Sequence, residues 1–418
     1  MSLYDTVVIG AGLAGLTTAC HLQNKGQRVM LIGHGVGALV LGSGCIDVLG
    51  YQPVESVEPV RAWPDKLSSF MADHPQHPYS LLGETKINEA LHAFQGLTET
   101  EYQQNGSENW LVPSAVGAIH PTCLAPPSIA KGHLGDTASM LIVGFEELRD
   151  FYPALISQNI SAQNLGIETE SLTLNLPEPG ASKLNITPIE LATLFEQADF
   201  RQQLVSVIKA RCQDYDRIGF PAVLGLGRHA KVVVDLEKQL GRPVFEVGTL
   251  PPSVPGRRLF EALKHTFVQA KGRMNIGTKV VAGEVKDGRV TQVQIETTNR
   301  LKPIIAENYV LATGGILGGG IQTDDQGRVW EPVFNLPIDH NSNRQTWFTP
   351  KFLSPVGQPV SSYGVVVNDR LNPIEDTRPI ADNLYIVGSL LAHADWTQGR
   401  TGYGVALTTA KHVADLLG

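Results

Sequence analysis

Cysteine is scarce and scattered in this sequence, and the pairs that usually bind metals are missing. Only four cysteines occur among 418 residues, and no C-x-x-C motif joins any two of them. Their spacing excludes a self-contained iron–sulfur ligand set of the usual kind and gives no zinc signature. No metal site is therefore predicted, and reduced thiols in a cytoplasmic protein are the simplest interpretation. The four are Cys20, Cys45, Cys123 and Cys212.

Long apolar runs, a leader segment and basic tracts are also missing. No stretch of about 18 consecutive apolar residues occurs, so no membrane-spanning helix is predicted. The first strand pattern begins near residue 4 and leaves no room for a signal peptide before it. The net charge of −8 and the lack of a Lys/Arg tract argue against a nucleic-acid surface. We therefore expect a cytoplasmic protein that reaches a membrane only through a partner.

The most informative segment that is present is a glycine-rich turn after the first apolar run. Residues 7–9 read as a buried strand, and Gly10-Ala11-Gly12-Leu13-Ala14-Gly15 opens a helical pattern directly after it. In this context a G-x-G-x-x-G motif indicates nucleotide binding. Gly10 would allow the sharp turn, Gly12 would let a phosphate approach the backbone, and Gly15 would let helix and strand pack closely. The phosphate would bind N–H groups at the helix N-terminus. The alternative is a turn that binds nothing.

The remaining periodicity indicates an α/β protein with a large insertion. Strands are expected at 28–32 and 384–387, and helices at 255–271 and 402–417. A hairpin is expected around Asp287-Gly288. We therefore predict a nucleotide-binding domain in two parts, residues 1–50 and 251–418. An inserted cap domain for substrate or partner would occupy residues 51–250.

Two further glycine segments distinguish the chain from a plain nicotinamide dehydrogenase. One strand-like run ends in Ala312-Thr313-Gly314-Gly315, and another ends in Gly388-Ser389 ahead of Gly402-Tyr403-Gly404 at the start of the last helix. With the first turn, they resemble two-domain, Rossmann-like flavoproteins of the glutathione-reductase and fumarate-reductase type. The resemblance implies that the second segment packs beside the flavin. It also implies that the last helix aims its N-terminal N–H groups at the pyrimidine ring. Ordinary helix capping is the alternative for that helix.

The residues just past the second strand add one expectation and one departure. In similar flavoproteins a small segment, here Ser43-Gly44, runs past the flavin, although a plain loop is equally compatible. A dinucleotide site usually has Asp or Glu at the end of the second strand to hold the adenosine ribose. Here Ile32 is followed by Gly33-His34-Gly35, so FMN is predicted in preference to FAD. The cofactor-binding residues implied are Gly10, Ala11, Gly12, Leu13, Ala14, Gly15, Ser43, Gly44, Thr313, Gly314, Gly388, Ser389, Gly402, Tyr403 and Gly404.

Longer strings resemble one flavoprotein family nearly from end to end, the B subunits of anaerobic glycerol-3-phosphate dehydrogenases. The most specific are HPYSLLG at 77–83, LPPSVPGRRL at 250–259 and GSGCIDVL at 42–49. The resemblance implies an FMN-binding subunit of a three-subunit enzyme that oxidises sn-glycerol 3-phosphate to dihydroxyacetone phosphate. It further implies a catalytic FAD subunit and an iron–sulfur membrane-anchor subunit as partners. Electrons would pass to quinone, and the chain would lie on the inner face of the cytoplasmic membrane.

Oxidation of a secondary alcohol by a flavin needs a base for the hydroxyl proton, and a phosphorylated substrate adds the need for a cation. His393 and Arg400, between the late strand and the last helix, are the candidates for base and substrate clamp, with a structural role equally compatible. Other candidates remain open. Arg257 and Arg258 could bind phosphate or form a solvated helix start, His340 and Arg344 could line a cleft or an exposed loop, and His77 is expected to shape a turn.

Three functional hypotheses follow from these observations. The first is the flavin subunit of the glycerol-3-phosphate dehydrogenase complex, which either oxidises substrate itself or relays electrons from a partner flavin. The second is a stand-alone FAD-dependent oxidoreductase of the fumarate-reductase type. The third is a non-catalytic scaffold subunit with an empty flavin fold. The missing ribose carboxylate disfavours the second, and retention of all three glycine segments disfavours the third.

Overall fold

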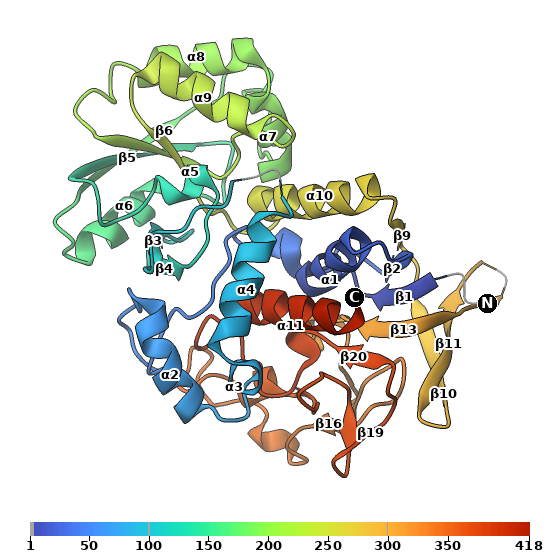
Figure 1. Cartoon of the computed structure of the whole chain (residues 1–418). Coiled ribbons are helices and arrows are strands. Elements are labelled where there is room, and N and C mark those ends of the chain that lie inside the picture. Colours follow the sequence, from blue (N-terminus) through green and yellow to red (C-terminus); the bar gives the residue numbers. More distant parts are fainter. Residues whose placement is uncertain (1–3, 99–100, 299) are drawn as a thin grey trace. The chain divides into compact units, whose positions relative to one another are not determined.

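Two parallel β-sheets, each in a separate unit of the chain, organise this protein (Figure 1). The computed structural model describes residues 4–98, 101–298 and 300–418. Unit 1 comprises Met1–Ala38, Asp47–Thr100 and Phe260–Gly418, and unit 2 comprises Leu39–Ile46 and Glu101–Leu259. Helix α10, Val254–Gln269, contains the point at which the chain passes from unit 2 to unit 1.

Unit 1 is built on a five-stranded parallel sheet in the order β20-β13-β1-β2-β9. The central strands are buried almost throughout, as expected for a parallel sheet covered on both faces. Helix α1 packs against α11, and α11 packs against α4. These elements are β1 Tyr4–Ile9, α1 Leu13–Asn24, β2 Val29–Gly33, α4 Glu84–Gln95, β9 Arg273–Ile276, β13 Ala306–Leu311, β20 Leu384–Ile386 and α11 Gly402–Leu417.

The rest of unit 1 consists of short helices, an antiparallel sheet and small two-stranded ladders. The turn of the β10–β11 hairpin is formed by Asp287 and Gly288, which both have positive φ, as a type I′ turn requires. The helices are α2 Trp63–Asp73 and α3 Pro78–Leu82, and the antiparallel strands are β10 Val280–Lys286, β11 Arg289–Glu296 and β12 Leu301–Ile304. The ladders are β14 Gln322–Thr323 with β15 Val329–Trp330, β16 Ile338–Asp339 with β17 Gly364–Val365, and β18 Ile374–Glu375 with β19 Arg378–Pro379. The 3-10 turns of the chain are η1 Gly37–Leu41, η2 Ile316–Gly318, η3 Arg344–Thr346, η4 Pro359–Ser362 and η5 Gly388–Leu390.

Unit 2 is built on a four-stranded parallel sheet in the order β6-β5-β7-β8. Its core is rich in phenylalanine, with Phe195 in edge contact with both Phe200 and Phe220. Helix α7 begins with a capping box between Thr187 and Glu190. The strands are β5 Ser139–Phe145, β6 Glu168–Leu174, β7 Arg217–Pro221 and β8 Val244–Val247, with the hairpin β3 Trp110–Pro113 and β4 Ile119–Thr122. The helices are α5 Pro127–Ala130, α6 Pro153–Ala162, α7 Pro188–Phe195, α8 Ala198–Ile208 and α9 His229–Leu240.

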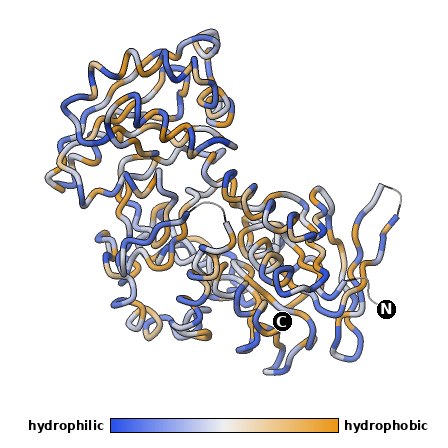
Figure 2. Tube along the Cα trace, turned by 45° about the horizontal axis from the view of Figure 1, so that its top comes forward, coloured by the Kyte–Doolittle hydropathy of each residue, from blue (hydrophilic) through white to orange (hydrophobic). Residues whose placement is uncertain are grey.

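The predicted α/β class is confirmed, and so are the predicted strand–helix–strand opening, the hairpin, the late strand and the closing helix. Hydrophobic and hydrophilic stretches are interspersed along the whole trace (Figure 2). Within the described ranges, none of the helices combines the length and the apolar character needed to cross a bilayer.

Candidate functional site

The glycine-rich turn between β1 and α1 has the geometry that its three glycines predict. Gly10 has a φ of +115°, and a Cβ added there would lie 2.1 Å from the Ala312 carbonyl oxygen. A Cβ at Gly15 would lie 1.9 Å from the Gly10 carbonyl oxygen, so only glycine lets α1 pack this closely on the turn. A Cβ at Gly12, by contrast, meets no described atom within 4 Å. Gly12 therefore faces open space, while its two neighbours in the motif are required by packing.

The N-terminus of α1 is suited to an anion. Gly12 is its N-cap, no described side chain caps the helix, and its first turn carries no acidic residue. The Thr313 hydroxyl, two residues past the end of β13, is buried and has no hydrogen-bond partner among the described residues. N–H groups at a helix N-terminus attract phosphate through both hydrogen bonding and the helix dipole. The turn thus fits the phosphate of a flavin nucleotide, with Gly12 giving it room.

Three glycine segments that lie far apart in the sequence meet at this turn. The Gly10 backbone lies against Ala312, as described above, and a Cβ at Gly388 would lie 2.8 Å from the Ala14 Cβ. The Gly315 N–H donates to the Ser389 hydroxyl at 3.3 Å. The ends of β1, β13 and β20 are neighbours in one parallel sheet, so the loops that follow them share one edge. The structure thereby brings together the first, second and third predicted segments.

The end of β2 has no place for the carboxylate that usually holds an adenosine ribose. A Cβ at Gly33 would lie 2.7 Å from the Ala11 Cβ and 2.9 Å from the Gly35 carbonyl oxygen. Any side chain at this position would therefore collide with the glycine-rich turn. His34, the next residue, is exposed.

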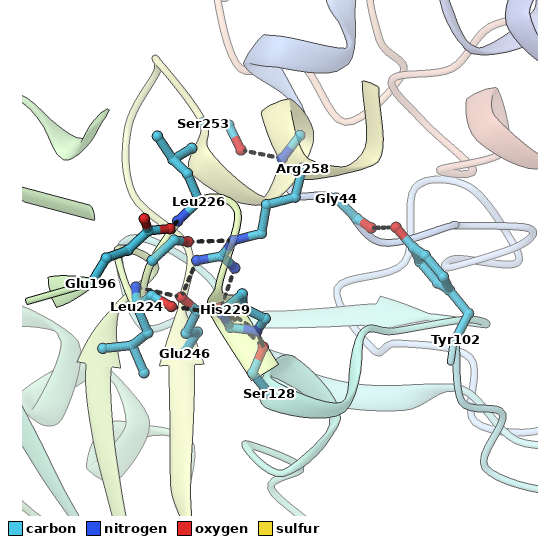
Figure 3. Close-up of polar contacts among 12 residues, drawn as sticks. Gly44, Tyr102, Ser128, Glu196, Leu224, Leu226, His229, Glu246, Ser253 and Arg258 are labelled. Atoms are coloured by element: carbon cyan, nitrogen blue, oxygen red, sulfur yellow. Dashed lines mark hydrogen bonds and ion pairs between the residues drawn. The ribbon is translucent and has the colours of Figure 1, made fainter. Parts of the chain in front are cut away.

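Ser43 and Gly44 belong to unit 2, and their described contacts lie within that unit. The Cys45 N–H donates to the Ser43 hydroxyl at 3.2 Å. The Tyr102 hydroxyl donates to the Gly44 carbonyl at 2.6 Å (Figure 3). A Cβ at Gly44 would lie 2.6 Å from the Pro255 Cβ, so this glycine is needed for packing. Their predicted position beside the flavin stays a prediction.

Other residues of unit 1 occupy part of the space at the N-terminus of α11. The Gly404 N–H donates to the Asp47 carbonyl at 2.9 Å, and a Cβ at Gly404 would lie 1.9 Å from the Tyr79 hydroxyl. A Cβ at Gly402 would lie 2.7 Å from the Trp396 Cβ. The expectation that this helix aims its N–H groups at the flavin ring therefore needs correction at Gly404, because a backbone carbonyl already accepts that N–H.

The two predicted catalytic residues, His393 and Arg400, lie on the loop between η5 and α11. Both have positive φ, +61° and +52°, which is uncommon for residues with a side chain and often marks functional sites. The His393 Nε2 lies 3.1 Å from an Asp339 carboxylate oxygen, and the Arg400 guanidinium lies 3.8 Å from the Asp47 carboxylate. Sequence analysis missed both carboxylates as partners, since nothing local in the sequence links them to residues so far along the chain.

A buried histidine supports the same loop. The His77 Nδ1 accepts the Tyr79 N–H at 3.1 Å, which caps α3, and Nε2 lies 3.3 Å from the Thr401 hydroxyl. Burial, with smaller contributions from His74 and His393, lowers the pKa of His77 to about 3. The ring is therefore neutral near pH 7, and its Nε2–H is the donor to Thr401. His77 shapes a turn, as predicted, and also holds Thr401, the N-cap residue of α11.

Arg258 pairs with a buried carboxylate. Both interpretations of it from the sequence, as a phosphate binder and as a solvated helix start, are therefore wrong. Its guanidinium makes two hydrogen bonds to the fully buried Glu246 carboxylate, at 2.7 and 2.9 Å, and a third to the Gly225 carbonyl (Figure 3). The Ser128 hydroxyl and the Leu224 N–H donate to the same carboxylate. Arg258 thus links α10 to β8 and to Gly225 within unit 2.

The loop that carries His340 and Arg344 belongs to unit 1. Arg344 is exposed and donates to the Asp325 backbone carbonyl, as an exposed loop predicts. The His340 Nδ1 lies 2.8 Å from the Ile338 carbonyl, a contact within the same short segment. Both side chains therefore have local structural contacts.

Comparisons with known proteins show the family of the chain. The family described as FAD binding domain matches residues 5–405. The B subunit of the anaerobic glycerol-3-phosphate dehydrogenase of Vibrio cholerae serotype O1 is 31% identical over 427 residues, 99% of this chain and 96% of the relative. The corresponding probable B subunit of Halobacterium salinarum is 31% identical over 423 residues, 97% of this chain and 95% of the relative.

Among solved structures, the 3-ketosteroid Δ1-dehydrogenase of Sterolibacterium denitrificans matches with a TM-score of 0.46 at 10% identity, covering 99% of both chains. The open conformation of a flavocytochrome c3 fumarate reductase matches with a TM-score of 0.44 at 9% identity, covering 99% of this chain and 78% of that one. The predicted flavoprotein fold class is confirmed. The matched family indicates a flavin and favours FAD over the FMN predicted from the sequence.

Proposed function

The chain belongs to the FAD-binding domain family and to the family of anaerobic glycerol-3-phosphate dehydrogenase B subunits, and from this premise we propose its activity. It is a flavin-dependent subunit that oxidises sn-glycerol 3-phosphate to dihydroxyacetone phosphate. Electrons pass to quinone through an iron–sulfur partner. The observation that carries the proposal is the meeting of the three glycine segments at an uncapped helix N-terminus.

In this proposal, residues of unit 1 bind the cofactor, take up the proton and bind the substrate phosphate. A bound flavin supplies the hydride acceptor. The turn from Gly10 to Gly15 holds its phosphate through the N–H groups of α1. His393 takes the proton of the substrate hydroxyl, and Arg400 binds the substrate phosphate as a charge-assisted donor. Gly402 and Tyr403, at the start of α11, would contact the flavin.

The proposed partners are a catalytic FAD subunit and an iron–sulfur membrane-anchor subunit, as the names of the relatives suggest a complex of several chains. Through them the chain lies on the inner face of the cytoplasmic membrane. A relay role, in which electrons enter from the partner flavin, is the second candidate, because Asp47 lies close enough to Arg400 to compete with a substrate phosphate.

Anaerobic titration of the purified protein tests where oxidation occurs. We expect flavin absorption bands that bleach when sn-glycerol 3-phosphate is added, because base and acceptor lie in one chain. Glycerol 1-phosphate of the opposite configuration is the matched control. Bands that persist until a partner subunit is added would establish the relay instead. A colourless protein that takes up neither FMN nor FAD would favour the empty scaffold, and bleaching by dicarboxylates or ketosteroids would favour the stand-alone oxidoreductase.

We further propose that the adenosine half of FAD contributes little to binding, because Gly33 and His34 offer no carboxylate to the ribose. A hydrogen bond from the ribose to a carboxylate would be worth ~1.5–3 kcal/mol, and that bond is missing. FMN and FAD should then bind with dissociation constants within about tenfold of each other. Mass analysis of released cofactor identifies which one the cell supplies. The substitution His34→Glu should raise the affinity for FAD about tenfold without changing that for FMN.

The control for this prediction is His34→Gln, which is polar but uncharged. Equal changes in the affinities for FMN and FAD in the His34→Glu variant would contradict the prediction. A wild-type preference for FAD of about a thousandfold or more would show that another group holds the ribose.

A further inference from the structure

The backbone of unit 1 places Asp339 beside His393 through three adjoining segments. Asp339, in β16, pairs with Gly364 in β17, and the next residue of β17 accepts the Ala392 N–H at 3.0 Å. The His393 N–H donates to the Ser362 carbonyl at 2.8 Å. A Cβ at Gly364 would lie 2.3 Å from the Ala392 nitrogen, so only glycine admits this approach. These backbone contacts therefore fix the position of Asp339 relative to His393.

This backbone placement brings the side chains of His393 and Asp339 into contact. The His393 Nε2 and the Asp339 Oδ2 are 3.1 Å apart, within hydrogen-bond distance. Neither is fully buried, since the imidazole is 29% and the carboxylate 49% exposed. His393 holds a φ of +61°, a conformation that persists where surrounding structure enforces it. An accessible ring held by a carboxylate at one nitrogen is the arrangement of an oriented general base.

We propose that Asp339 is a positioning residue for His393. This proposal rests on the proposed function. The carboxylate accepts the Nε2–H and so holds the imidazole in the tautomer whose Nδ1 carries the free lone pair. In substrate oxidation the hydroxyl O–H bond breaks and its proton passes to Nδ1. A bound flavin would supply the acceptor for the carbon's hydride with its electron pair, and the C–O bond would become a carbonyl. Asp339 then stabilises the imidazolium and is not itself protonated.

The test uses Asp339→Asn in the holoenzyme, which removes the charge but keeps the shape. We expect kcat for sn-glycerol 3-phosphate to fall about tenfold or more, with KM changed less than about twofold, because proton transfer is impaired while substrate contacts remain. Nitrogen-15 NMR of histidine-labelled protein should show the Nε2–H tautomer of His393 in the wild type and a mixture in the variant. Asp339→Glu should restore most of kcat. The control is Asp325→Asn, an equal charge change at an exposed site of the same unit.

The outcomes separate this inference from the function on which it rests. An unchanged kcat and an unchanged tautomer in Asp339→Asn would overturn it, and so would a raised KM with normal kcat, which would mean a binding role. A wild-type holoenzyme that does not oxidise sn-glycerol 3-phosphate would overturn the proposed function. In that case the tautomer measurement alone decides whether Asp339 positions His393, because it needs no turnover.

Discussion

Replacing Glu246 by glutamine is expected to destabilise unit 2 by about 3–5 kcal/mol, the cost of leaving a buried charge without its partner. Glu246 is fully buried and receives hydrogen bonds from the Arg258 guanidinium, the Ser128 hydroxyl and the Leu224 N–H (Figure 3). Glutamine keeps the shape but leaves the guanidinium unpaired. Hydrogen exchange followed by mass spectrometry should show faster exchange in β8 and α9 than in the wild type.

A matched surface pair supplies the control. Glu89 pairs with Lys86 at 2.9 Å, but both side chains are more than a third exposed, so Glu89→Gln should cost less than about 1 kcal/mol. The double variant Glu246→Gln with Arg258→Met should lose less than the sum of the two single variants, because it removes the orphaned charge. Additive losses would show that the two groups are not coupled, against the contacts seen here.

The same pair has a defined pH dependence. Burial alone raises the pKa of Glu246, but the Arg258 and His229 charges and the hydrogen bonds outweigh it and hold the pKa at about 2. The ordinary pKa is 4.5, so the folded-state value is the lower one. The stabilisation is therefore complete above pH 4.5 and is lost as pH falls from 4.5 toward 2. Glu246→Gln should remove this part of the acid transition, which circular dichroism across that pH range would measure.

Local patterns in the sequence are enough to predict the elements that build the flavin-type site. The apolar run before Gly10, the hairpin at Asp287-Gly288 and the strand at 384–387 are each encoded within a few residues. Glycines in the motif also indicate where backbones approach closely, as they do at Gly10 and Gly15. The meeting of the three segments could be inferred because loops after parallel strands share an edge.

Side-chain partners are not predictable by the same means. The Arg257-Arg258 pair at the start of a helix indicates a solvated helix start, whereas the partner of Arg258, Glu246, belongs to a strand of otherwise apolar residues. Asp339 and His393 are brought together by the pairing of β16 with β17 and of β17 with the loop after η5. Such contacts depend on tertiary register, which periodicity and motif spacing do not encode.

Gly12→Ala is expected to weaken flavin binding strongly in a protein that still folds, and it has the largest functional effect among the substitutions considered. The added methyl group would meet no described protein atom within 4 Å, and the backbone of Gly12 is extended, which alanine readily adopts. Stability should therefore change by less than about 1 kcal/mol. The methyl would instead occupy the space in front of the α1 N-terminus, where we propose that the phosphate binds. Flavin affinity, measured by fluorescence quenching on titration, should fall about a hundredfold or more.

Two other glycines make this result interpretable. Gly15→Ala places its Cβ 1.9 Å from the Gly10 carbonyl oxygen, so it should lose both flavin and stability, because helix and turn must separate. Gly96→Ala makes only an ordinary 3.6 Å contact at the end of α4 and should lose neither. Normal flavin affinity in Gly12→Ala would mean that the phosphate lies elsewhere. A large loss of stability in that variant would mean instead that Gly12, like Gly15, is required by packing, and the turn would then carry no specific signal for a nucleotide.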